Sequence, residues 1–269
     1  MSANLDELLI FGKQIANKAG ELARSIRLSG DLKIKEKGPR DFVTAADLAV
    51  ESLLVSAIKE KYPQHKFLTE EGSEGTEVDV NYKGEMWVID PIDGTTNFRH
   101  GLHHVGVSLA YCNNGQVMCG IVAAPFLGEI FSAVRGKGAF RNDYPIKAST
   151  CSKISDALIA TGFPYQRDDL TLLLNRLEKV ITRCRDLRRD GACSIDICNV
   201  ACGRLDGYYE TVNAWDIAAA RLIALEAGAL ASTSSLRKRD VNPELDGEEI
   251  IVAAPGLINE LREILLSSK

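Results

Sequence analysis

The segment MWVIDPIDGTTNF, residues 86–98, contains the strongest structural signal in the chain. Its first four residues, Met86 to Ile89, are apolar and stop abruptly at Asp90 and Pro91, as a buried strand does where it passes into a loop. The segment therefore predicts a strand whose end delivers two carboxylates, Asp90 and Asp93, to one loop. Mg²⁺ prefers oxygen ligands, so this loop is a candidate site for a hard cation.

The residues between and after these carboxylates suit the same purpose. Pro91 lacks a backbone N–H and fixes one torsion, which favours aiming the carbonyl of Ile92 at the same cation. Gly94 lets a phosphate approach the backbone closely, and Thr95 adds a hydroxyl. Two plainer interpretations stay open: Asp93 and Gly94 form an ordinary turn, and Thr95 only caps the next turn.

Two helices are predicted before this segment. Asn4 and Glu7 have the spacing of a helix start, and apolar residues then recur every three or four positions, at Leu8, Phe11, Ile15, Ala19, Leu22 and Ile26. The second helix begins at Thr44, which stands with Asp47 in capping-box spacing. Between the helices, the polar stretch 33–41 has no periodicity and predicts a mobile loop.

After the segment, the pattern changes twice. Residues 105–140 form short β-rich runs separated by turn residues, which predicts antiparallel hairpins. Later residues alternate between strand and helix patterns. Strands are expected at 157–160, 208–210 and 250–253, and helices at 170–181 and 215–226, the last closed by Gly228. The second half is therefore expected to be α/β, without internal repeats.

Length, charge and hydropathy exclude several classes of protein. The 269 residues, 45% of them hydrophobic, are enough for one compact unit or two tightly joined halves. A net charge of -5 without a block of like charge argues against nucleic acid as a partner. No apolar run approaches the ~20 residues needed to span a bilayer, and the first residues do not resemble a signal peptide. A soluble cytoplasmic protein is expected.

The seven cysteines are odd in number and include no CxxC pair, which favours reduced thiols over a disulfide framework. Cys193, Cys198 and Cys202 could be read as a soft-metal site. Small packing residues on one helix are the preferred interpretation, and all seven are treated as structural.

Several of these segments together carry a resemblance to a known family. Residues 87–98 resemble the first signature of the inositol monophosphatase family, a group of Mg²⁺-dependent, Li⁺-sensitive phosphatases. WDIAAA at 215–220, with EAG at 226–228, resembles the second signature, and the two stand in the family's order. DFVTAAD at 41–47 and TEEG at 69–72 extend the resemblance over most of the chain.

The resemblance implies a fold and an assembly. The expected fold is α/β (mixed α+β), a layered αβαβα sandwich with an antiparallel N-terminal sheet and an α/β C-terminal half. Residues 1–145 would carry most metal ligands, and residues 146–269 would carry Asp216 and the substrate pocket. The family is usually homodimeric, with the active site between the two halves of one chain.

The resemblance also implies two or three bound Mg²⁺ ions, with Glu70, Asp90, the Ile92 carbonyl, Asp93 and Asp216 as ligands. Four carboxylates brought together without cations would repel one another and lose hydration, so the arrangement makes sense as an occupied metal site. Two metals about 3.5 to 4 Å apart can activate a water and stabilise the departing alkoxide in an in-line displacement. No covalent intermediate is then required.

Catalytic roles follow from the same resemblance. Thr95 and Glu70 would position the attacking water, and Asp47 would hydrogen-bond Thr95, although Asp47 also fits a helix cap. The residues expected to contact substrate are Gly94, Thr95, Asp93, Gly191, Ala192, Cys193, Glu210 and Asp216. Asp216 has a plainer interpretation as a carboxylate at a helix start. His103 and His104 are given no catalytic role.

The chain departs from the family pattern near the expected leaving-group pocket. The usual Glu-x-Gly-x-x-x-Trp-Asp segment is here ETVNAWD, residues 210–216, one residue shorter and without its glycine. In the segment that usually reads Gly-Ser/Thr-Ala-Ala, Cys193 replaces an alanine. Ala220 and Ala229 stand where glycine is usual, which changes packing more than chemistry. None of these departures touches an expected metal ligand.

Together these features predict a Mg²⁺-dependent phosphatase acting on a small phosphate monoester. Myo-inositol monophosphate is the first candidate, because the carboxylate of Glu210 suits polyol hydroxyls. A nucleotide bisphosphate, a sugar bisphosphate and histidinol phosphate are alternatives with the same chemistry. An inactive binding or scaffold protein is a further alternative; loss of a ligand would mark it, and every expected ligand is present.

Overall fold

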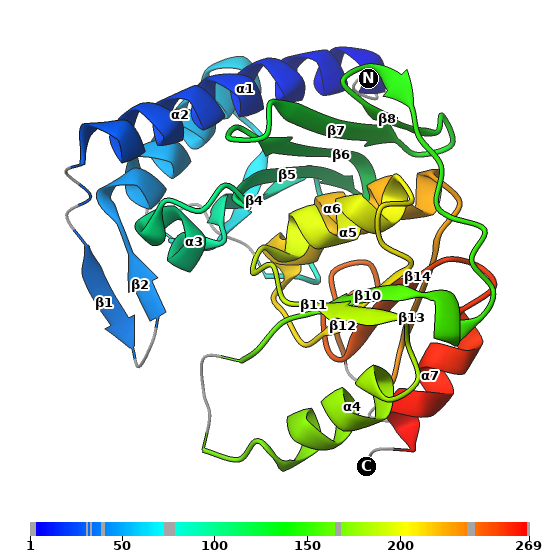
Figure 1. Ribbon diagram of the computed structural model, residues 1–269. Helices are drawn as coiled ribbons and strands as arrows, with labels where there is room; N and C mark the ends of the chain where they lie inside the picture. Colours follow the sequence, from blue (N-terminus) through cyan, green and yellow to red (C-terminus); the bar gives the residue numbers. More distant parts are fainter. Residues whose placement is uncertain are drawn as a thin grey trace.

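The computed structural model describes residues 4–30, 32, 34–38, 41–72, 79–164, 168–235 and 240–267. Within these ranges, layers of helices alternate with two large sheets (Figure 1). The layers follow in the order α1 with α2, the seven-stranded sheet, α5 with α6, the five-stranded sheet, and α4 with α7. The predicted αβαβα sandwich is confirmed.

The seven-stranded sheet has the order β3-β4-β5-β6-β7-β8-β9. Its strands are β3 (Lys66–Thr69), β4 (Met86–Asp93), β5 (Gly106–Asn113), β6 (Gln116–Ala124), β7 (Glu129–Val134), β8 (Ala139–Arg141) and β9 (Tyr144–Pro145). The predicted hairpins between 105 and 140 are confirmed as antiparallel pairs. The sheet is not antiparallel throughout, because β3 pairs parallel with β4. The segment 70–85 between them is long enough for the crossover that a parallel pair requires.

The five-stranded sheet is mixed and has the order β11-β10-β12-β14-β13. Its strands are β10 (Leu158–Thr161), β11 (Asp186–Arg188), β12 (Gly207–Glu210), β13 (Leu230–Thr233) and β14 (Ile250–Ala253). Strand β10 is parallel to both neighbours, whereas β14 is antiparallel to both of its own. The three strands predicted in this half are therefore confirmed within a residue or two.

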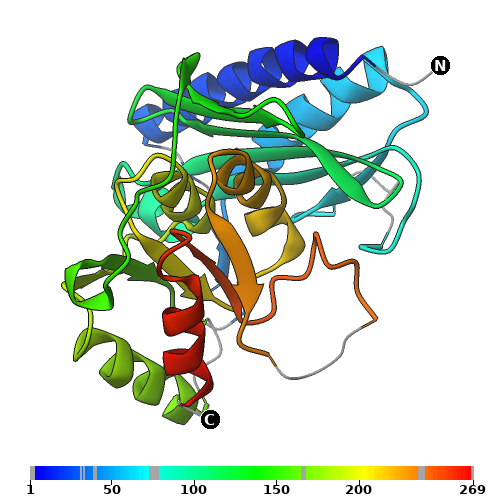
Figure 2. The same ribbon diagram turned by 90° about the vertical axis from the view of Figure 1, so that its right-hand side faces the viewer.

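Helices α1 (Leu5–Ser29) and α2 (Ala45–Lys61) cover the outer face of the seven-stranded sheet (Figure 2). Both begin as predicted, α1 at the N-cap Asn4 and α2 at a capping box formed by Thr44 and Asp47. The remaining α-helices in the described ranges are α3 (Thr95–His100), α4 (Thr171–Ile181), α5 (Cys193–Ala201), α6 (Ala214–Glu226) and α7 (Ile258–Leu266). A 3₁₀ turn, η1, spans Ile154–Asp156.

The loop predicted at 33–41 is wrong for most of its described residues. Strands β1 (Lys35–Gly38) and β2 (Asp41–Val43) pair antiparallel there. Backbone hydrogen bonds form such a ribbon, so it needs no apolar alternation in the sequence. Positions 33, 39 and 40 lie outside the described residues.

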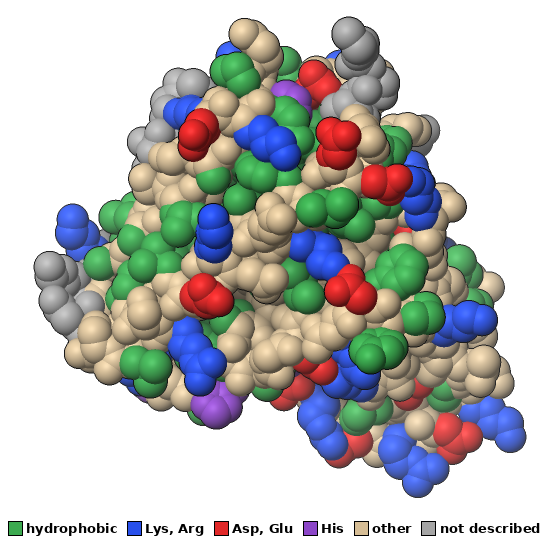
Figure 3. Space-filling view, turned by 90° about the horizontal axis from the view of Figure 1, so that it is seen from above, with side chains coloured by type: hydrophobic (Ala, Val, Ile, Leu, Met, Phe, Trp, Pro, Cys, Tyr) green, Lys and Arg blue, Asp and Glu red, His purple; other side chains and the backbone are tan. Residues whose placement is uncertain are grey.

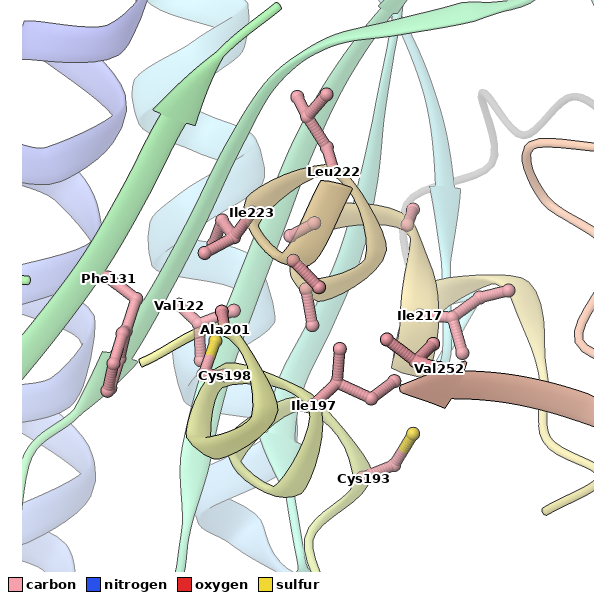
Figure 4. Packing of buried hydrophobic residues seen from close by; sticks show 14 of the residues in the cluster. Val122, Phe131, Cys193, Ile197, Cys198, Ala201, Ile217, Leu222, Ile223 and Val252 are labelled. Carbon is pink, nitrogen blue, oxygen red and sulfur yellow. The ribbon is translucent and has the colours of Figure 1, made fainter. Parts of the chain in front are cut away.

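The middle layer forms the core that joins the two sheets. Figure 4 shows Ile197 of α5 between Val122 of the seven-stranded sheet and Val252 of β14. Leu222 of α6 belongs to the same buried cluster and points toward the top of that view. Alanines fill most of the buried side of α6, so the helix approaches β5 and β6 closely. The cysteines are free thiols, and those on α5 are buried in this cluster, as the packing interpretation predicted. This packing fixes the position of the α6 N-terminus.

The molecular surface is mixed in charge on the face seen in Figure 3, where acidic and basic side chains are interspersed with small apolar groups. Among the described residues, no helix combines the length and the apolar character that crossing a membrane requires.

Candidate active site

Strand β4 brings Asp90 and Asp93 to one place. The strand continues beyond the apolar run that predicted it, as far as Asp93. Its pairing with β5 slips between the two aspartates, since Asp90 lies opposite Ser108 and Asp93 lies opposite Gly106. Side chains three positions apart in a regular strand point to opposite faces, and an irregularity of this kind redirects one of them. Both carboxylates can therefore reach the same site.

Glu70 is brought to the site by the parallel pairing of β3. Thr69 lies opposite Ile89, and the Glu70 N–H donates to the Ile89 carbonyl at 3.2 Å. The next residues of the two strands, Glu70 and Asp90, are therefore neighbours. Burial raises the pKa of Asp90, and the charge of Glu70 raises it further.

Asp216 arrives from the first turn of α6. The Asn213 N–H donates to its Oδ2 at 2.7 Å and closes a capping box. The Ser108 hydroxyl donates to the Trp215 carbonyl at 3.2 Å and ties this turn to β5. One oxygen each of Asp90, Asp93 and Asp216 lie within 4.8 Å of one another. Asp216 is thus both the expected helix-start carboxylate and a member of the acidic group.

We call Glu70, Asp90, Asp93 and Asp216 the acidic cluster. Burial raises the pKa of Asp90 and of Asp216 well above the usual range, and charges of other cluster members raise both further. Buried carboxylates that converge in this way cost free energy unless protons or cations compensate their charge. All the atoms that the cluster offers to a metal are carboxylate oxygens, the ligands that Mg²⁺ prefers. The residues present therefore fit a hard divalent cation.

Thr95 stands beside the cluster at the start of α3. Gly94, with φ of 89°, is the N-cap of this helix, so the interpretation of Thr95 as a cap is wrong. The Thr95 hydroxyl has two acceptors, the Ile92 carbonyl at 3.2 Å and Oδ1 of Asp47 at 3.4 Å. Thr95 is buried, so these contacts restrict the orientation of its hydroxyl.

Asp47 makes both of the contacts that the sequence left open. Its Oδ2 accepts hydrogen bonds from the N–H and the hydroxyl of Thr44, at 2.8 and 2.5 Å. Its Oδ1 faces Thr95. The capping box therefore holds the carboxylate that contacts Thr95.

The start of α5 binds Asp93 through three hydrogen bonds. The Cys193 N–H donates to Oδ1 at 3.1 Å, while the N–H and hydroxyl of Ser194 donate to Oδ2 at 2.7 and 2.5 Å. Burial raises the pKa of Asp93, and the Ser194 hydrogen bonds oppose that rise. Ala192, the N-cap, makes no side-chain cap, and Asp93 takes its place. The contact of Ser194 was not predicted, because no spacing rule connects positions 93 and 194.

Asn97 joins the two segments expected to surround the phosphate, and it too was missed. Its Nδ2 donates to the carbonyls of His104 and Asp190, at 2.8 and 2.7 Å. This holds α3 against the segment that begins at Gly191. A Cβ atom built on Gly94 would lie 3.1 Å from the Gly191 carbonyl, so the two glycines are neighbours.

Glu210 closes the far side of the site at the end of β12. A Cβ atom at position 162 would lie 2.0 Å from both of its carboxylate oxygens, so Gly162 leaves the space that Glu210 occupies. The Tyr208 hydroxyl donates to Glu210 Oε2, and burial raises the Glu210 pKa to about 7. The shortened segment after it is held by a hydrogen bond from the Val212 N–H to the Gly247 carbonyl at 3.1 Å. With the residue missing, the Glu210 charge still lies close enough to act on the pKa of Asp216.

A cation and an aromatic ring stand beside Glu210. The Arg189 guanidinium lies over the Phe163 ring, 5.2 Å from its centroid. The Arg189 charge opposes the rise that burial imposes on the pKa of Glu210. Neither residue was expected at the site, because each comes from a segment without a recognisable motif.

The two histidines take up other contacts. His103 stacks on Phe126 with ring centroids 5.9 Å apart, and His104 Nε2 lies 2.9 Å from Asp196 Oδ1. His104, Asp190 and Asp196 are close enough to share a metal ion. Because His104 already pairs with Asp196, we assign this group a structural role.

Comparison with known proteins identifies the family of this chain. The family model described as the inositol monophosphatase family matches residues 4–266. The chain belongs to this family. Within the inositol monophosphatase family fold, it is similar to the Thermotoga maritima IMPase, with a TM-score of 0.85 and 29% identity over 97% of this chain and 98% of that one. It is also similar to SaIMPase-II solved with 2′AMP bound, with a TM-score of 0.81 and 26% identity over 97% and 95% of the two chains.

Similar curated proteins carry two different names. Nus factor SuhB of Salmonella typhimurium is 39% identical over 230 residues, which is 84% of each chain. Inositol monophosphatase 2 of Solanum lycopersicum is 38% identical over 231 residues, 84% of this chain and 87% of that protein. The inositol monophosphatase family is a family of metal-dependent phosphatases that act on small phosphate esters, and the acidic cluster could bind metal.

Proposed function

We propose that the protein hydrolyses myo-inositol monophosphate to inositol and phosphate with the help of Mg²⁺. One observation carries the proposal: Glu210, an acceptor for hydroxyl groups, lies beside the acidic cluster. The Glu210 charge is close enough to add to the rise that burial and the cluster impose on the pKa of Asp216. A polyol phosphate can then place its phosphate at the cluster and its hydroxyls at Glu210.

The expected ligands of two or three Mg²⁺ ions are Glu70, Asp90, the Ile92 carbonyl, Asp93 and Asp216. Bound there, Mg²⁺ would supply Lewis-acid chemistry, neutralising phosphate charge and making water more acidic. We also propose a homodimer, as the family resemblance implies, and a cytoplasmic location.

The chain's own groups would orient the reactants. The Thr95 hydroxyl, placed between Ile92 and Asp47, would fix the attacking water together with Glu70. The backbone N–H groups of Gly94 and Thr95, at the start of α3, would bind phosphate oxygens. Positioning of this kind removes much of the entropic barrier to in-line attack.

The sugar-like part of the substrate would lie against Glu210. Because Tyr208 donates to Glu210 Oε2, we assign Oε1 to the ring hydroxyls. Gly191, Ala192 and Cys193, at the start of α5, would contact the sugar-like part as well. The Cys193 side chain is buried, so its contribution would be shape rather than chemistry.

Activity should depend wholly on Mg²⁺. Phosphate release from myo-inositol 1-phosphate is expected to stop when a chelator is added in excess and to return when Mg²⁺ is restored. Millimolar Li⁺ should inhibit, because it would occupy an exchangeable cation position. Full activity in excess chelator would contradict the role of the acidic cluster.

Glu210→Gln should weaken turnover of inositol phosphate selectively. A charge-assisted hydrogen bond contributes roughly 1.5 to 3 kcal/mol, so kcat/KM for myo-inositol 1-phosphate should fall about tenfold or more. An aryl phosphate without hydroxyls should be nearly unaffected, and the exposed Glu60→Gln serves as control. Equal losses on both substrates would mean that Glu210 supports the metal site instead.

The pH dependence of the same variant gives a second readout. The pKa of Glu210, raised by burial to about 7, makes the side chain neutral below that pH and anionic above it. Repulsion of a second phosphate should therefore grow as pH rises from 6 to 8. The preference for inositol monophosphate over fructose bisphosphate should rise over that range in the wild type and stay flat in Glu210→Gln. If the preference of the wild type for inositol monophosphate over fructose bisphosphate does not change with pH, the charge of Glu210 does not determine that preference.

A nucleotide phosphate is the second candidate, favoured by Arg189 and Phe163. A cation over an aromatic ring offers one contact for a second phosphate and another for a base. SaIMPase-II binds 2′AMP in its solved structure. A phosphate-release screen over inositol phosphates, bisphosphonucleotides, sugar phosphates and histidinol phosphate separates the candidates. Preference for a bisphosphorylated substrate would overturn the inositol assignment and leave the metal-assisted mechanism standing.

A further inference from the structure

Ser194 contributes a hydroxyl that helix formation does not require. Its N–H already donates to Asp93 Oδ2 at 2.7 Å, and its hydroxyl donates to the same oxygen at 2.5 Å. The family pattern places its hydroxyl residue at the second position of this segment and alanine at the fourth. This chain has the reverse, with Ala192 second and Ser194 fourth. The contact between Ser194 and Asp93 is therefore a feature of this chain rather than of the pattern.

Strand β5 leaves the space in which this hydroxyl lies. Gly106 pairs with Asp93 across the two strands. A Cβ atom on Gly106 would lie 2.7 Å from the Ser194 Oγ and 3.7 Å from the Asp93 Cβ. The first distance is shorter than carbon and oxygen atoms tolerate without moving. We call the space between Gly106 and Ser194 the hydroxyl seat.

The hydrogen bonds to Asp93 divide its two oxygens unequally. An ionised carboxylate has about two acceptor sites on each oxygen. Oδ2 accepts both donors of Ser194, whereas Oδ1 accepts the Cys193 N–H at 3.1 Å. Oδ2 is thereby filled, and Oδ1 keeps one site. Rotation of the carboxylate would break all three bonds at once.

We infer that Ser194 is a positioning residue that holds Asp93 so that Oδ1 alone faces the cation. The inference rests on the proposed function, in which Asp93 is a metal ligand. Partners that orient a metal ligand typically change metal affinity or activity by 10- to 100-fold when they are removed. Two of the three bonds to Asp93 come from backbone N–H groups and survive truncation of Ser194, so an effect near the lower end is expected.

The test measures Mg²⁺ binding directly, by calorimetry on chelator-treated protein without substrate. Ser194→Ala should bind Mg²⁺ about tenfold more weakly than the wild type, because the carboxylate of Asp93 is less firmly oriented. Ser149→Ala is the matched control, since the Ser149 hydroxyl donates to Asp206 Oδ1 at 2.6 Å beyond the other end of α5. This control should bind Mg²⁺ as the wild type does.

The hydroxyl seat provides a second variant with a distinctive signature. Gly106→Ala should displace the Ser194 hydroxyl and weaken Mg²⁺ binding to a similar extent. In the Ser194→Ala background the seat is empty, so adding Gly106→Ala should cause no further loss. Circular dichroism at the calorimetry temperature shows that each variant is folded.

The outcomes distinguish this inference from the proposed function. If Ser194→Ala binds Mg²⁺ within twofold of the wild type while Asp93→Asn binds it more weakly, the role of Ser194 is wrong and the metal assignment stands. Independent, multiplicative losses in the double variant would also overturn the role of Ser194. Wild-type protein that fails to bind Mg²⁺ would overturn both this inference and the proposed function.

Discussion

Asp90→Asn should abolish turnover and, at the same time, stabilise the metal-free protein. Asparagine keeps the shape, and its Oδ1 can still accept the Ile92 N–H that Asp90 accepts at 3.0 Å. The variant lacks the charge that attracts the cation, worth several kcal/mol in the transition state, so kcat/KM should fall about a thousandfold or more. It also lacks one of the charges that repel one another without metal. The Tm of the metal-free protein should rise by about 2–4 °C for each kcal/mol of repulsion removed.

Replacing a metal ligand should lower activity and raise the stability of the metal-free protein, whereas replacing a structural aspartate should change stability alone. Asp206→Asn is the control, because Asp206 accepts hydrogen bonds from Ser149 and Leu158 away from the site. It should lower the Tm and leave turnover near normal below the transition. Asp93→Asn and Asp216→Asn should lose activity as Asp90→Asn does. Near-normal turnover of Asp93→Asn at saturating Mg²⁺ would refute the assignment of the cluster.

Thr95→Ala should lower kcat about a hundredfold and leave KM nearly unchanged. The Thr95 hydroxyl lies between the Ile92 carbonyl and Asp47, and orienting the attacking water acts on the transition state more than on substrate binding. Positioned proton-transfer groups contribute typically 10²–10⁴-fold, which sets the expected size. Thr96→Ala removes the adjacent, exposed hydroxyl and is the matched control.

The separate changes in kcat and KM show whether Thr95 acts in catalysis or in substrate binding. An unchanged kcat with a higher KM would make Thr95 a binding residue. Asp47→Asn should resemble Thr95→Ala, and the double variant should be no worse than either, because residues that act as a unit give non-additive losses. Asp47 also caps α2, so its variant needs a Tm measurement beside the kinetics.

The differences between prediction and structure have physical causes that particular residues show. The expected strand at Met86–Ile89 continues to Asp93, because pairing with β5 extends it through residues that no apolar pattern marks. The expected loop at 33–41 contains a hairpin for the same reason: backbone hydrogen bonds leave no trace in side-chain pattern. By contrast, the capping box at Thr44 and helix α6 follow local rules and were predicted correctly.

The sequence by itself determined the local features: strand and helix starts, the pair of carboxylates that follows Ile89, and the family through its signatures. Such features depend on neighbours a few positions apart, which the order of residues states directly. Only the tertiary structure decided which distant residues meet. Examples are the shift of strand register between Asp90 and Asp93, the hydroxyl of Ser194 in the space left by Gly106, and the carboxylate of Glu210 in the space left by Gly162. These contacts arise because two sheets pack against the same pair of helices, and packing at that density fixes positions that no spacing along the chain encodes.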